Sequence, residues 1–180
     1  MKQLILGGAR SGKSVLAEQL AKNSGKPVIY IATTNTAYND NEMHSRIQHH
    51  QQRRPSDWQT VETPLLLAKQ LEQLASPEHC LLIDCLTLWL TNCLMEEDAE
   101  TWPQQRQALL DCLASLPGDI ILVGNEVGSG VVPLGELNRR FVDENGFLHQ
   151  SLATICDRVI LTAAGLPLVM KGPLLSTEGE

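Results

Sequence analysis

A short stretch near the start of the chain, GGARSGKS, has residue types and a spacing that can hold phosphate groups. Its Gly7, Gly12, Lys13 and Ser14 satisfy the pattern G-x-x-x-x-G-K-[ST] of a phosphate-binding loop. In such a loop the glycines let backbone N–H groups and a helix N-terminus face the phosphates, the lysine reaches the outer phosphates, and the hydroxyl ligates Mg²⁺. A glycine-rich turn without this role is the alternative, but an apolar run precedes the loop and a helical pattern follows it, as the mechanism requires. We therefore expect a nucleotide to be bound by Gly7, Gly8, Ala9, Arg10, Ser11, Gly12, Lys13 and Ser14.

A carboxylate for the metal is expected at the end of a strand next to this loop. Asp84 closes the apolar run CLLID, so the predicted Mg²⁺ ligands are Ser14 and Asp84. The alternative is that Asp84 caps a helix that begins at Leu86, and the two roles are compatible. The sequence contains no N-K-x-D motif for reading guanine, which argues against a switch GTPase.

A histidine among arginines is the third chemical feature, in the stretch RIQHHQQRRP from Arg46 to Pro55. In a helix, Arg46 and His50 are four residues apart and share one side, and Arg53 lies three residues further along it. Neighbouring positive charges favour the neutral imidazole, which is the form that can attack phosphorus. By residue type alone the plainer alternative is favoured, a histidine that is packed or solvated on a helix.

The elements that would position these groups alternate along the chain, because short apolar runs of β type are separated by longer helical patterns. This alternation is typical of an α/β fold with a mostly parallel sheet flanked by helices. The last run follows its predecessor too closely for a right-handed crossover, so we expect a C-terminal antiparallel hairpin after a Gly-Leu-Pro turn. The predicted strands are Gln3–Leu6, Val28–Ala32, Cys80–Asp84, Ile120–Gly124, Arg158–Thr162 and Leu168–Lys171.

Helices are expected between these strands. Thr63 and Pro64 form an N-cap and N1 pair in front of the third helix, and the last helix contains Gly146, a potential site of a bend or break. The acidic segment from Glu96 to Glu100 is expected to be a solvated loop. The predicted helices are Ser14–Asn23, Asn41–Arg53, Leu65–Ala75, Leu86–Met95, Pro103–Leu116 and Glu136–Cys156.

Length and charge limit the class of protein. With 180 residues we expect a single P-loop domain, residues 1–180. The net charge of -7 and the pI near 5.2 argue against a broad electrostatic grip on nucleic acid or anionic lipid. A recombinase-like ATPase that binds single-stranded nucleic acid would fit the order of strands and loop, but the acidic balance and the lack of an aromatic and basic groove weigh against it.

Cysteine usage and the N-terminal sequence bear on location. The five cysteines have no CxxC spacing and fall mostly in apolar runs, so we expect reduced thiols in the core. The N-terminus has no long apolar signal region, and no apolar run approaches the length of about 18 residues that spans a membrane. We therefore expect a cytoplasmic protein without a membrane span.

Seven separated motifs, taken in order, resemble those of one known family. They are GGARSGKS, YIATT (Tyr30 to Thr34), RIQHH…RRP, DWQTVE (Asp57 to Glu62), LLIDCLTLWLTN (Leu81 to Asn92), NEVGSGVVP (Asn125 to Pro133) and RRFVDENG (Arg139 to Gly146). On these residues the chain closely resembles the bifunctional adenosylcobinamide kinase / adenosylcobinamide-phosphate guanylyltransferase family of cobalamin assembly, the CobU family. The resemblance extends over nearly the whole chain and implies a P-loop NTPase fold of the recombinase-like type.

The resemblance also implies two consecutive reactions. In the first, the terminal phosphoryl group of ATP or GTP passes to the aminopropanol hydroxyl of adenosylcobinamide and gives adenosylcobinamide phosphate. In the second, a histidine attacks the α-phosphorus of GTP, pyrophosphate leaves, and the substrate phosphate takes the GMP from the histidine to give adenosylcobinamide-GDP. The family likeness further implies Mg²⁺ with the nucleotide and a propeller-like homotrimer. The runner-up is a P-loop small-molecule kinase without the guanylyltransferase step.

The family pattern R-I-x-x-H-x-x-x-R-P assigns the nucleophile. Aligning the flanking Arg-Ile and Arg-Pro pairs places it at His50, and the adjacent His49 is the competing choice.

The likeness also implies nucleotide contacts beyond the phosphate loop. The residues are Thr33, Thr34, Asn35, Gln51, Gln52, Arg53, Arg54, Glu62 and Asp84. Without the family likeness, Glu62 would be interpreted as a surface acid.

Three positions depart from the usual family pattern. Gln51 stands where a basic residue is common, so one phosphate contact is either missing or supplied by Arg53. Val142 replaces the arginine of a segment that usually reads FRD, and His149 replaces the asparagine of G-x-x-N-Q. These two departures leave the corrinoid and subunit contacts of that helix unassigned.

Overall fold

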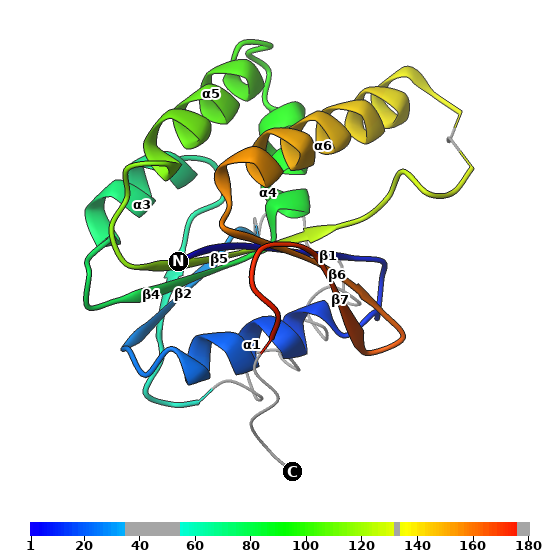
Figure 1. The fold of residues 1–180 in the computed structure, drawn as a ribbon. Helices are drawn as coiled ribbons and strands as arrows, with labels where there is room; N and C mark the ends of the chain where they lie inside the picture. The colour runs from blue at the N-terminus through cyan, green and yellow to red at the C-terminus, as the bar shows by residue number, and fades with distance from the viewer. Residues whose placement is uncertain (35–54, 132–133, 176–180) are drawn as a thin grey trace.

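The computed structural model describes residues 1–34, 55–131 and 134–175 and contains a seven-stranded sheet (Figure 1). The strand order is β3-β2-β4-β5-β1-β6-β7. Neighbouring strands are parallel except for the antiparallel β6–β7 pair, which confirms the predicted mostly parallel sheet with a C-terminal hairpin. The strands are β1 (Lys2–Gly7), β2 (Val28–Ala32), β3 (Gln59–Glu62), β4 (Cys80–Asp84), β5 (Asp119–Asn125), β6 (Arg158–Ala163) and β7 (Leu166–Lys171).

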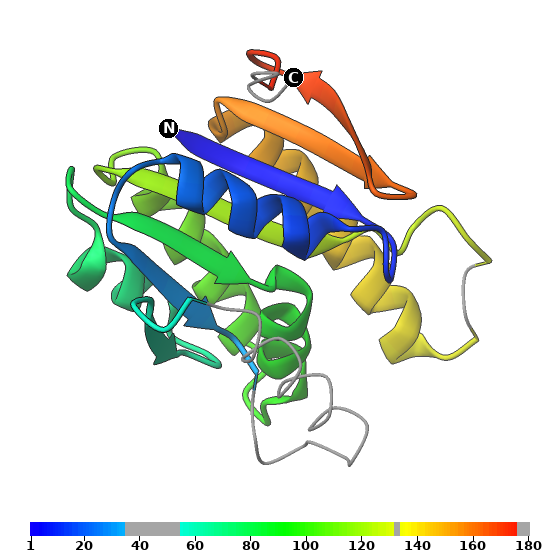
Figure 2. The same cartoon turned by 90° about the horizontal axis from the view of Figure 1, so that it is seen from below.

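Helices cover both faces of the sheet, as is usual where parallel strands are apolar on both sides. Helix α1 lies against one face, and α3, α4, α5 and α6 lie against the other (Figure 1). Figure 2 shows the first of these faces, where α1 packs over β1, β5 and β4. The helices are α1 (Lys13–Asn23), α3 (Leu67–Leu74), α4 (Leu86–Met95), α5 (Thr101–Leu113) and α6 (Glu136–Ile155).

Alternate residues of the central strands pack into two separate cores. On β5, Ile120 and Leu122 join the core under α3, α4, α5 and α6, which we call the four-helix core. Ile121 and Val123 join the core under α1, which we call the α1 core. Because side chains along a strand point alternately to the two faces, the face of each strand residue follows from the core that its neighbours join.

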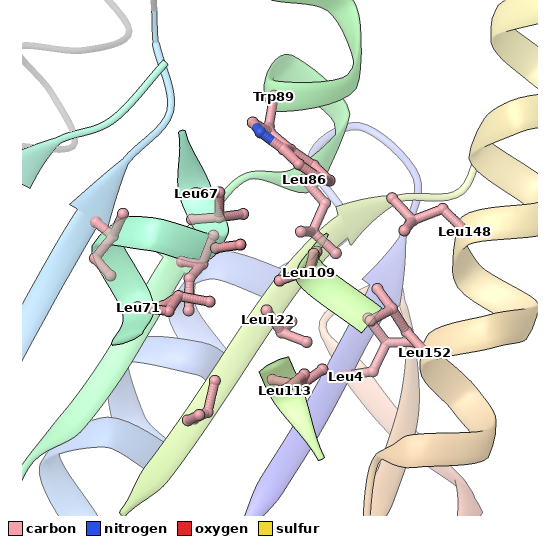
Figure 3. Packing of buried hydrophobic residues seen from close by; sticks show 14 of the residues in the cluster. Leu4, Leu67, Leu71, Leu86, Trp89, Leu109, Leu113, Leu122, Leu148 and Leu152 are labelled. Carbon is pink, nitrogen blue, oxygen red and sulfur yellow. The ribbon is translucent and has the colours of Figure 1, made fainter. Parts of the chain in front are cut away.

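The four-helix core is filled by leucine and tryptophan side chains (Figure 3). The rings of Trp89 on α4 and Trp102 on α5 meet edge to face, with centroids 5.4 Å apart and planes at 67°. Leu71 brings α3 onto this core, and Leu148 and Leu152 bring α6 onto it. The helices of this face therefore pack as one layer against the sheet.

One strand was missing from the sequence prediction. β3 is an edge strand that pairs with β2, from Ile29 opposite Gln59 to Ala32 opposite Glu62. Its residues, QTVE, are exposed or half-buried and carry no apolar run. An edge strand of this kind lacks the hydrophobic signal that identified the buried strands.

The N-cap pair predicted for α3, Thr63 and Pro64, is wrong. The helix begins later than predicted, at Leu67. The N–H of Thr63 donates instead to the carbonyl oxygen of Ala32 at 2.8 Å and continues the β2–β3 pairing. Side chains of α4 donate to the next two carbonyl groups of the chain, so tertiary contacts decide where the helix begins.

The hairpin turn lies earlier than the predicted Gly-Leu-Pro turn. Ala164 and Gly165 form it, both with positive φ (52° and 79°), and Ala163 pairs with Leu166 directly after them. Two residues with positive φ match the twist of a two-residue hairpin. Pro167 is therefore part of the edge strand β7, where a missing N–H is tolerated.

The remaining helix predictions agree closely with the structure. The bounds of α4 coincide with the prediction, and α5 covers Thr101–Leu113 instead of Pro103–Leu116. Helix α6 continues through Gly146 without a break. The helix predicted over Asn41–Arg53 lies outside the described residues.

Two features predicted from composition are confirmed. All five cysteines are free and buried. The acidic segment from Glu96 to Glu100 is exposed.

In the part of the chain that the structure describes, no helix combines the length and apolarity needed to cross a membrane.

Candidate functional site

The segment between β1 and α1 curls back on itself, as a phosphate-binding loop must. Arg10 and Gly12 adopt positive φ angles of 57° and 97°. The N–H of Ser11 donates to the carbonyl oxygen of Gly8 at 3.2 Å, and the ammonium group of Lys13 donates to the same oxygen at 3.1 Å. Helix α1 has no side-chain N-cap among the described residues, so its first N–H groups are available to an anion.

Close packing holds this loop on both sides. A methyl group on Gly7 would meet the Ser11 hydroxyl and would stand 2.5 Å from the carbonyl oxygen of Thr162, so only glycine fits there. The N–H of Gly165, in the β6–β7 turn, donates to the carbonyl oxygen of Ser11 at 2.9 Å. The N–H of Glu126 donates to the carbonyl oxygen of Gly7 at 3.0 Å. The loop is thus fixed between the hairpin turn and the segment that follows β5.

Two hydroxyl groups at the loop are buried without a partner. The Ser11 and Thr162 hydroxyls make no hydrogen bond to any described residue. Leaving a buried polar group unpaired costs free energy, so such groups normally bond to a ligand or to water. Both hydroxyls lie where the loop packs against β6.

Asp84 ends β4 on the α1 face of the sheet, because Leu82 of the same strand joins the α1 core. The hydroxyl of Tyr30 donates to Oδ2 of Asp84 at 3.0 Å. Burial raises the pKa of the Cys85 thiol to about 11, the charge of Asp84 acts in the same direction, and the charge of Lys13 opposes it. β1 and β4 run in the same direction on either side of β5, so the loop that follows β1 and the carboxylate that ends β4 lie at the same sheet edge.

The segment after Asp84 is held by Thr33, the residue that directly follows β2. The Thr33 hydroxyl donates to the carbonyl oxygen of Cys85 at 2.7 Å and accepts from the N–H of Cys85 at 3.0 Å. Nδ2 of Asn92 donates to the carbonyl oxygen of Thr33 at 2.7 Å. Cys85 is the N-cap residue of α4 and the cap has no side-chain hydrogen bond, so the alternative role of Asp84 as a helix cap is wrong. Thr33 is fully buried and positions the Asp84 segment, and a direct nucleotide contact from it stays a prediction.

The predicted magnesium ligands have the right chemistry for that ion. The Ser14 hydroxyl, in the first turn of α1, and the Asp84 carboxylate offer the hard oxygen donors that Mg²⁺ prefers. In residues 1–34, 55–131 and 134–175, no cluster of three His, Cys, Asp or Glu side chains could hold a metal alone. The ion would therefore share its coordination between these two residues, phosphate oxygens and water, which is its usual mode.

Of the other residues predicted to contact the nucleotide, the structure describes some and leaves the rest outside its described ranges. Glu62 is exposed at the carboxyl end of β3, and Thr34 is half-buried just after the end of β2. Both lie at the sheet edge that carries the phosphate loop, because β1, β2 and β3 run in one direction. The predicted residues outside the described part of the chain are Asn35, His49, His50, Gln51, Gln52, Arg53 and Arg54.

A further residue at this edge was not predicted as part of the site. Asn125 ends β5, and β5 lies between β1 and β4. The signal was present in the sequence, since Asn125 follows the apolar run IILVG as Asp84 follows its own run. The order of the strands, which sequence reasoning did not supply, places Asn125 between the loop and Asp84.

Comparison with known sequences decides the family. Residues 3–170 match the profile of the family described as cobinamide kinase / cobinamide phosphate guanyltransferase. The chain belongs to this family. The resemblance of the seven motifs to the CobU family is thereby confirmed, together with the expectation of an enzyme that is a kinase and a nucleotidyltransferase.

Curated relatives support the CobU assignment over nearly the full length. A protein of Pseudomonas aeruginosa named bifunctional adenosylcobalamin biosynthesis protein CobP is 58% identical over 172 residues, covering 96% of this chain and 98% of the relative. Its counterpart in Escherichia coli (strain K12), named CobU, is 37% identical over 184 aligned positions, covering 95% and 100%. Among solved structures, a protein of Pyrococcus horikoshii OT3 has a TM-score of 0.57 at 9% identity, covering 95% of this chain and 86% of that chain, a likeness in fold alone.

Two departures from the CobU family pattern lie on α6. His149 is 6% exposed, its ring lies against Gly124 of β5, and its Nε2 has no hydrogen-bond partner among the described residues. Burial lowers the pKa of His149, and the nearby charge of Glu126 opposes that shift. Val142 is half-buried. The His149 side chain is therefore a packing group between α6 and the sheet and does not form an exposed contact surface.

Proposed function

We propose that this protein phosphorylates the aminopropanol hydroxyl of adenosylcobinamide and then transfers GMP from GTP, through a GMP-histidine intermediate, to give adenosylcobinamide-GDP in cobalamin biosynthesis. The observation that carries the proposal is that Lys13, Ser14 and Asp84 lie at one sheet edge, in a chain that matches the family over residues 3–170. The names of the relatives, which describe bifunctional proteins of adenosylcobalamin biosynthesis, support both halves.

In the first step the phosphate loop holds the terminal phosphates of ATP or GTP. The substrate hydroxyl oxygen attacks the γ-phosphorus, the bond to the bridging oxygen breaks, and a nucleoside diphosphate and the hydroxyl proton leave. The N–H groups at the start of α1 and the ammonium group of Lys13 stabilise charge on the phosphoryl oxygens. When bound by Ser14 and Asp84, Mg²⁺ supplies further neutralisation of the phosphates.

In the second step His50 is the nucleophile. Its ring nitrogen attacks the α-phosphorus of GTP, a P–N bond forms, and pyrophosphate leaves. An oxygen of the substrate phosphate then attacks the same phosphorus and the P–N bond breaks. His50 lies outside the described residues. The proposal is supported by the chain order, because the segment that contains His50 begins directly after Thr34, which lies at the sheet edge that carries the loop.

The corrinoid substrate is proposed to enter over the carboxyl ends of the strands, where open α/β sheets bind ligands. A corrinoid is large compared with a chain of 180 residues, so we include in the proposal a homotrimer in which neighbouring chains share a site. The proposed location is cytoplasmic, and neither a nucleic acid nor a membrane is a proposed partner.

Product analysis tests both halves of the proposal. Purified protein is incubated with adenosylcobinamide, Mg²⁺ and GTP, and the corrinoids are separated and weighed by mass spectrometry. We expect adenosylcobinamide phosphate first and adenosylcobinamide-GDP later, and neither product from Lys13→Ala. The matched control is Lys22→Ala, which removes an exposed lysine from the far end of α1 and should leave both reactions intact.

The outcomes separate the two reactions. Accumulation of the phosphate without the GDP product would retain the kinase and overturn the guanylyltransferase half. A wild-type protein that forms neither corrinoid product from GTP or ATP would overturn the whole proposal.

A further inference from the structure

The carboxyl end of β5 separates the phosphate loop from Asp84. In the register of the sheet, Asn125 stands opposite Gly7 of β1, where the loop begins. On its other side, β5 pairs with β4, and Asp84 stands opposite Val123. Asn125 thus ends β5 two residues beyond the position opposite Asp84 and lies beside the start of the loop.

Asn125 also belongs to the correct face of the sheet. Ile121 and Val123 join the α1 core, so the alternation of the strand assigns Asn125 to the α1 face. Asp84 lies on the same face, for the same reason on β4. This is the face on which α1 begins at Lys13. The carboxamide of Asn125 is therefore directed to the side of the edge where the loop would hold phosphates.

Two buried side chains fix the backbone of Asn125. Its N–H donates to the hydroxyl of Thr87 on α4 at 2.8 Å, and its carbonyl oxygen accepts from Nδ2 of Asn145 on α6 at 3.1 Å. Thr87 and Asn145 are 7% and 2% exposed. Buried polar side chains are costly unless they are hydrogen-bonded, and here two of them bond to the main chain of a single residue. The position of Asn125 is thereby set before any ligand binds.

The side-chain carboxamide of Asn125, unlike its backbone, is not held by neighbouring residues that the structure describes. It is half-buried, and within residues 1–34, 55–131 and 134–175 it makes no hydrogen bond to another residue. A fixed backbone with an unengaged polar side chain is the arrangement expected of a group that is preorganised for a ligand.

We propose that Nδ2 of Asn125 donates a hydrogen bond to the terminal phosphoryl group of the bound nucleoside triphosphate. This inference rests on the proposed function, in which the phosphate loop holds that triphosphate. The contact exists for a triphosphate and is absent for a diphosphate, because only the triphosphate carries the outer group. It adds a neutral donor to the positive groups of the loop and positions the phosphoryl group for transfer.

Calorimetric titration at fixed Mg²⁺ tests the contact. All proteins carry His50→Ala, so that the nucleophile cannot attack the α-phosphorus of the analogue, which the imido bridge does not protect. The probes are GDP and the β,γ-imido analogue of GTP, and the variants are Asn125→Ala and Asn125→Asp. The aspartate variant keeps the shape of the side chain and replaces the donor by an acidic oxygen, and it covers the case in which the alanine variant does not fold. Asn23→Ala, at the exposed end of α1, is the matched control.

We expect both Asn125 variants to bind the triphosphate analogue about tenfold more weakly or worse, as for the loss of one hydrogen bond to a charged group, with a larger loss for aspartate. Affinity for GDP should change less than about twofold, because the diphosphate lacks the contacted group. In steady-state assays the phosphoryl-transfer kcat should fall while the KM for adenosylcobinamide stays at its wild-type value.

Three other results are informative. Unchanged affinity for the analogue in both variants would overturn the role of Asn125. An equal loss for GDP and the analogue would also overturn it, because it would indicate a structural role for the residue. A protein with Asn125 intact that binds neither nucleotide would instead contradict the proposed function on which the inference rests.

Discussion

The hydroxyl of Tyr30 and the carboxylate of Asp84 are joined by a 3.0 Å hydrogen bond across neighbouring strands β2 and β4. Tyr30 is 3% exposed and Asp84 is half-buried at the sheet edge. A buried phenol whose ring is fixed by packing therefore orients the carboxylate that is the predicted metal ligand. This contact gives the site a supporting residue that acts through Asp84.

Removing this contact should weaken the use of Mg²⁺ without unfolding the protein. In Tyr30→Phe the packed ring is kept and one hydrogen bond is lost, so we expect kcat of phosphoryl transfer to fall about 3–10-fold and the Mg²⁺ concentration for half-maximal rate to rise. Asp84→Asn, which removes the charge itself, should lower kcat by about 100-fold or more. Initial rates across a Mg²⁺ titration measure both effects. A Tyr30→Phe enzyme with the wild-type Mg²⁺ dependence would contradict this role.

Gly7→Ala should destabilise the loop through a steric clash. The added methyl group would meet the Ser11 hydroxyl and the carbonyl oxygen of Thr162, and the carbonyl oxygen belongs to the backbone of β6 and cannot easily move. We expect a loss of about 1–3 kcal/mol in the free energy of unfolding, the usual cost of overpacking. Gly8→Ala is the stability control, because a methyl group there has no neighbour within 4 Å.

Thermal unfolding of the two glycine variants gives the measurement. Each kcal/mol should lower Tm by roughly 2–4 °C in a protein of this size. Equal Tm values for Gly7→Ala and Gly8→Ala would show that the packing around Gly7 does not restrict it.

The thiols of the folded protein should be unreactive. Burial raises their pKa values, to about 11 for Cys80, Cys85 and Cys112 and to about 12 for Cys93 and Cys156. Because the thiolate is the reactive form, we expect the native protein to release negligible coloured thiol from an aromatic disulfide reagent near pH 8. In denaturant, all five cysteines should react and release it. Rapid reaction of a thiol in the native protein would contradict the buried placement.

His149 should make the folded protein less stable in mild acid. Its folded-state pKa is lowered, mainly by burial, so the unfolded chain binds a proton more readily. Stability is therefore unaffected well above the unfolded pKa of about 6.5 and falls as the pH drops below it. We expect a smaller loss of stability between pH 7.5 and pH 5 in His149→Asn than in the wild type, by urea unfolding at both pH values. Identical losses would exclude His149 as the cause.

The sequence predicted the parts of the site that are local in the chain. The phosphate loop is one continuous motif, and Asp84 could be placed because a polar residue that ends an apolar strand lies at the carboxyl edge. The role of Asn125 could not be predicted in the same way. Its anchors, Thr87 and Asn145, are 38 and 20 residues away, and its place beside Gly7 depends on the strand order.

The edge strand and the start of the third helix were mispredicted for different reasons. β3 carries no apolar run that would identify it. The capping signal at Thr63 and Pro64 was present but misleading, because the N–H of Thr63 donates to Ala32 and continues the strand pairing. The assignment of His50 rests on the family resemblance and lies outside the described residues, so it stays a prediction.

The proposed GMP-histidine intermediate is tested most directly by covalent labelling with α-³²P-GTP. Purified protein is incubated with the labelled nucleotide and Mg²⁺, and acid-labile, base-stable label on the protein is measured for the wild type, His50→Ala and His49→Ala. If His50 is the nucleophile, we expect label on the wild type and on His49→Ala and none on His50→Ala. Label that persists in His50→Ala, or a wild-type protein that acquires none while it still phosphorylates adenosylcobinamide, would contradict this proposal.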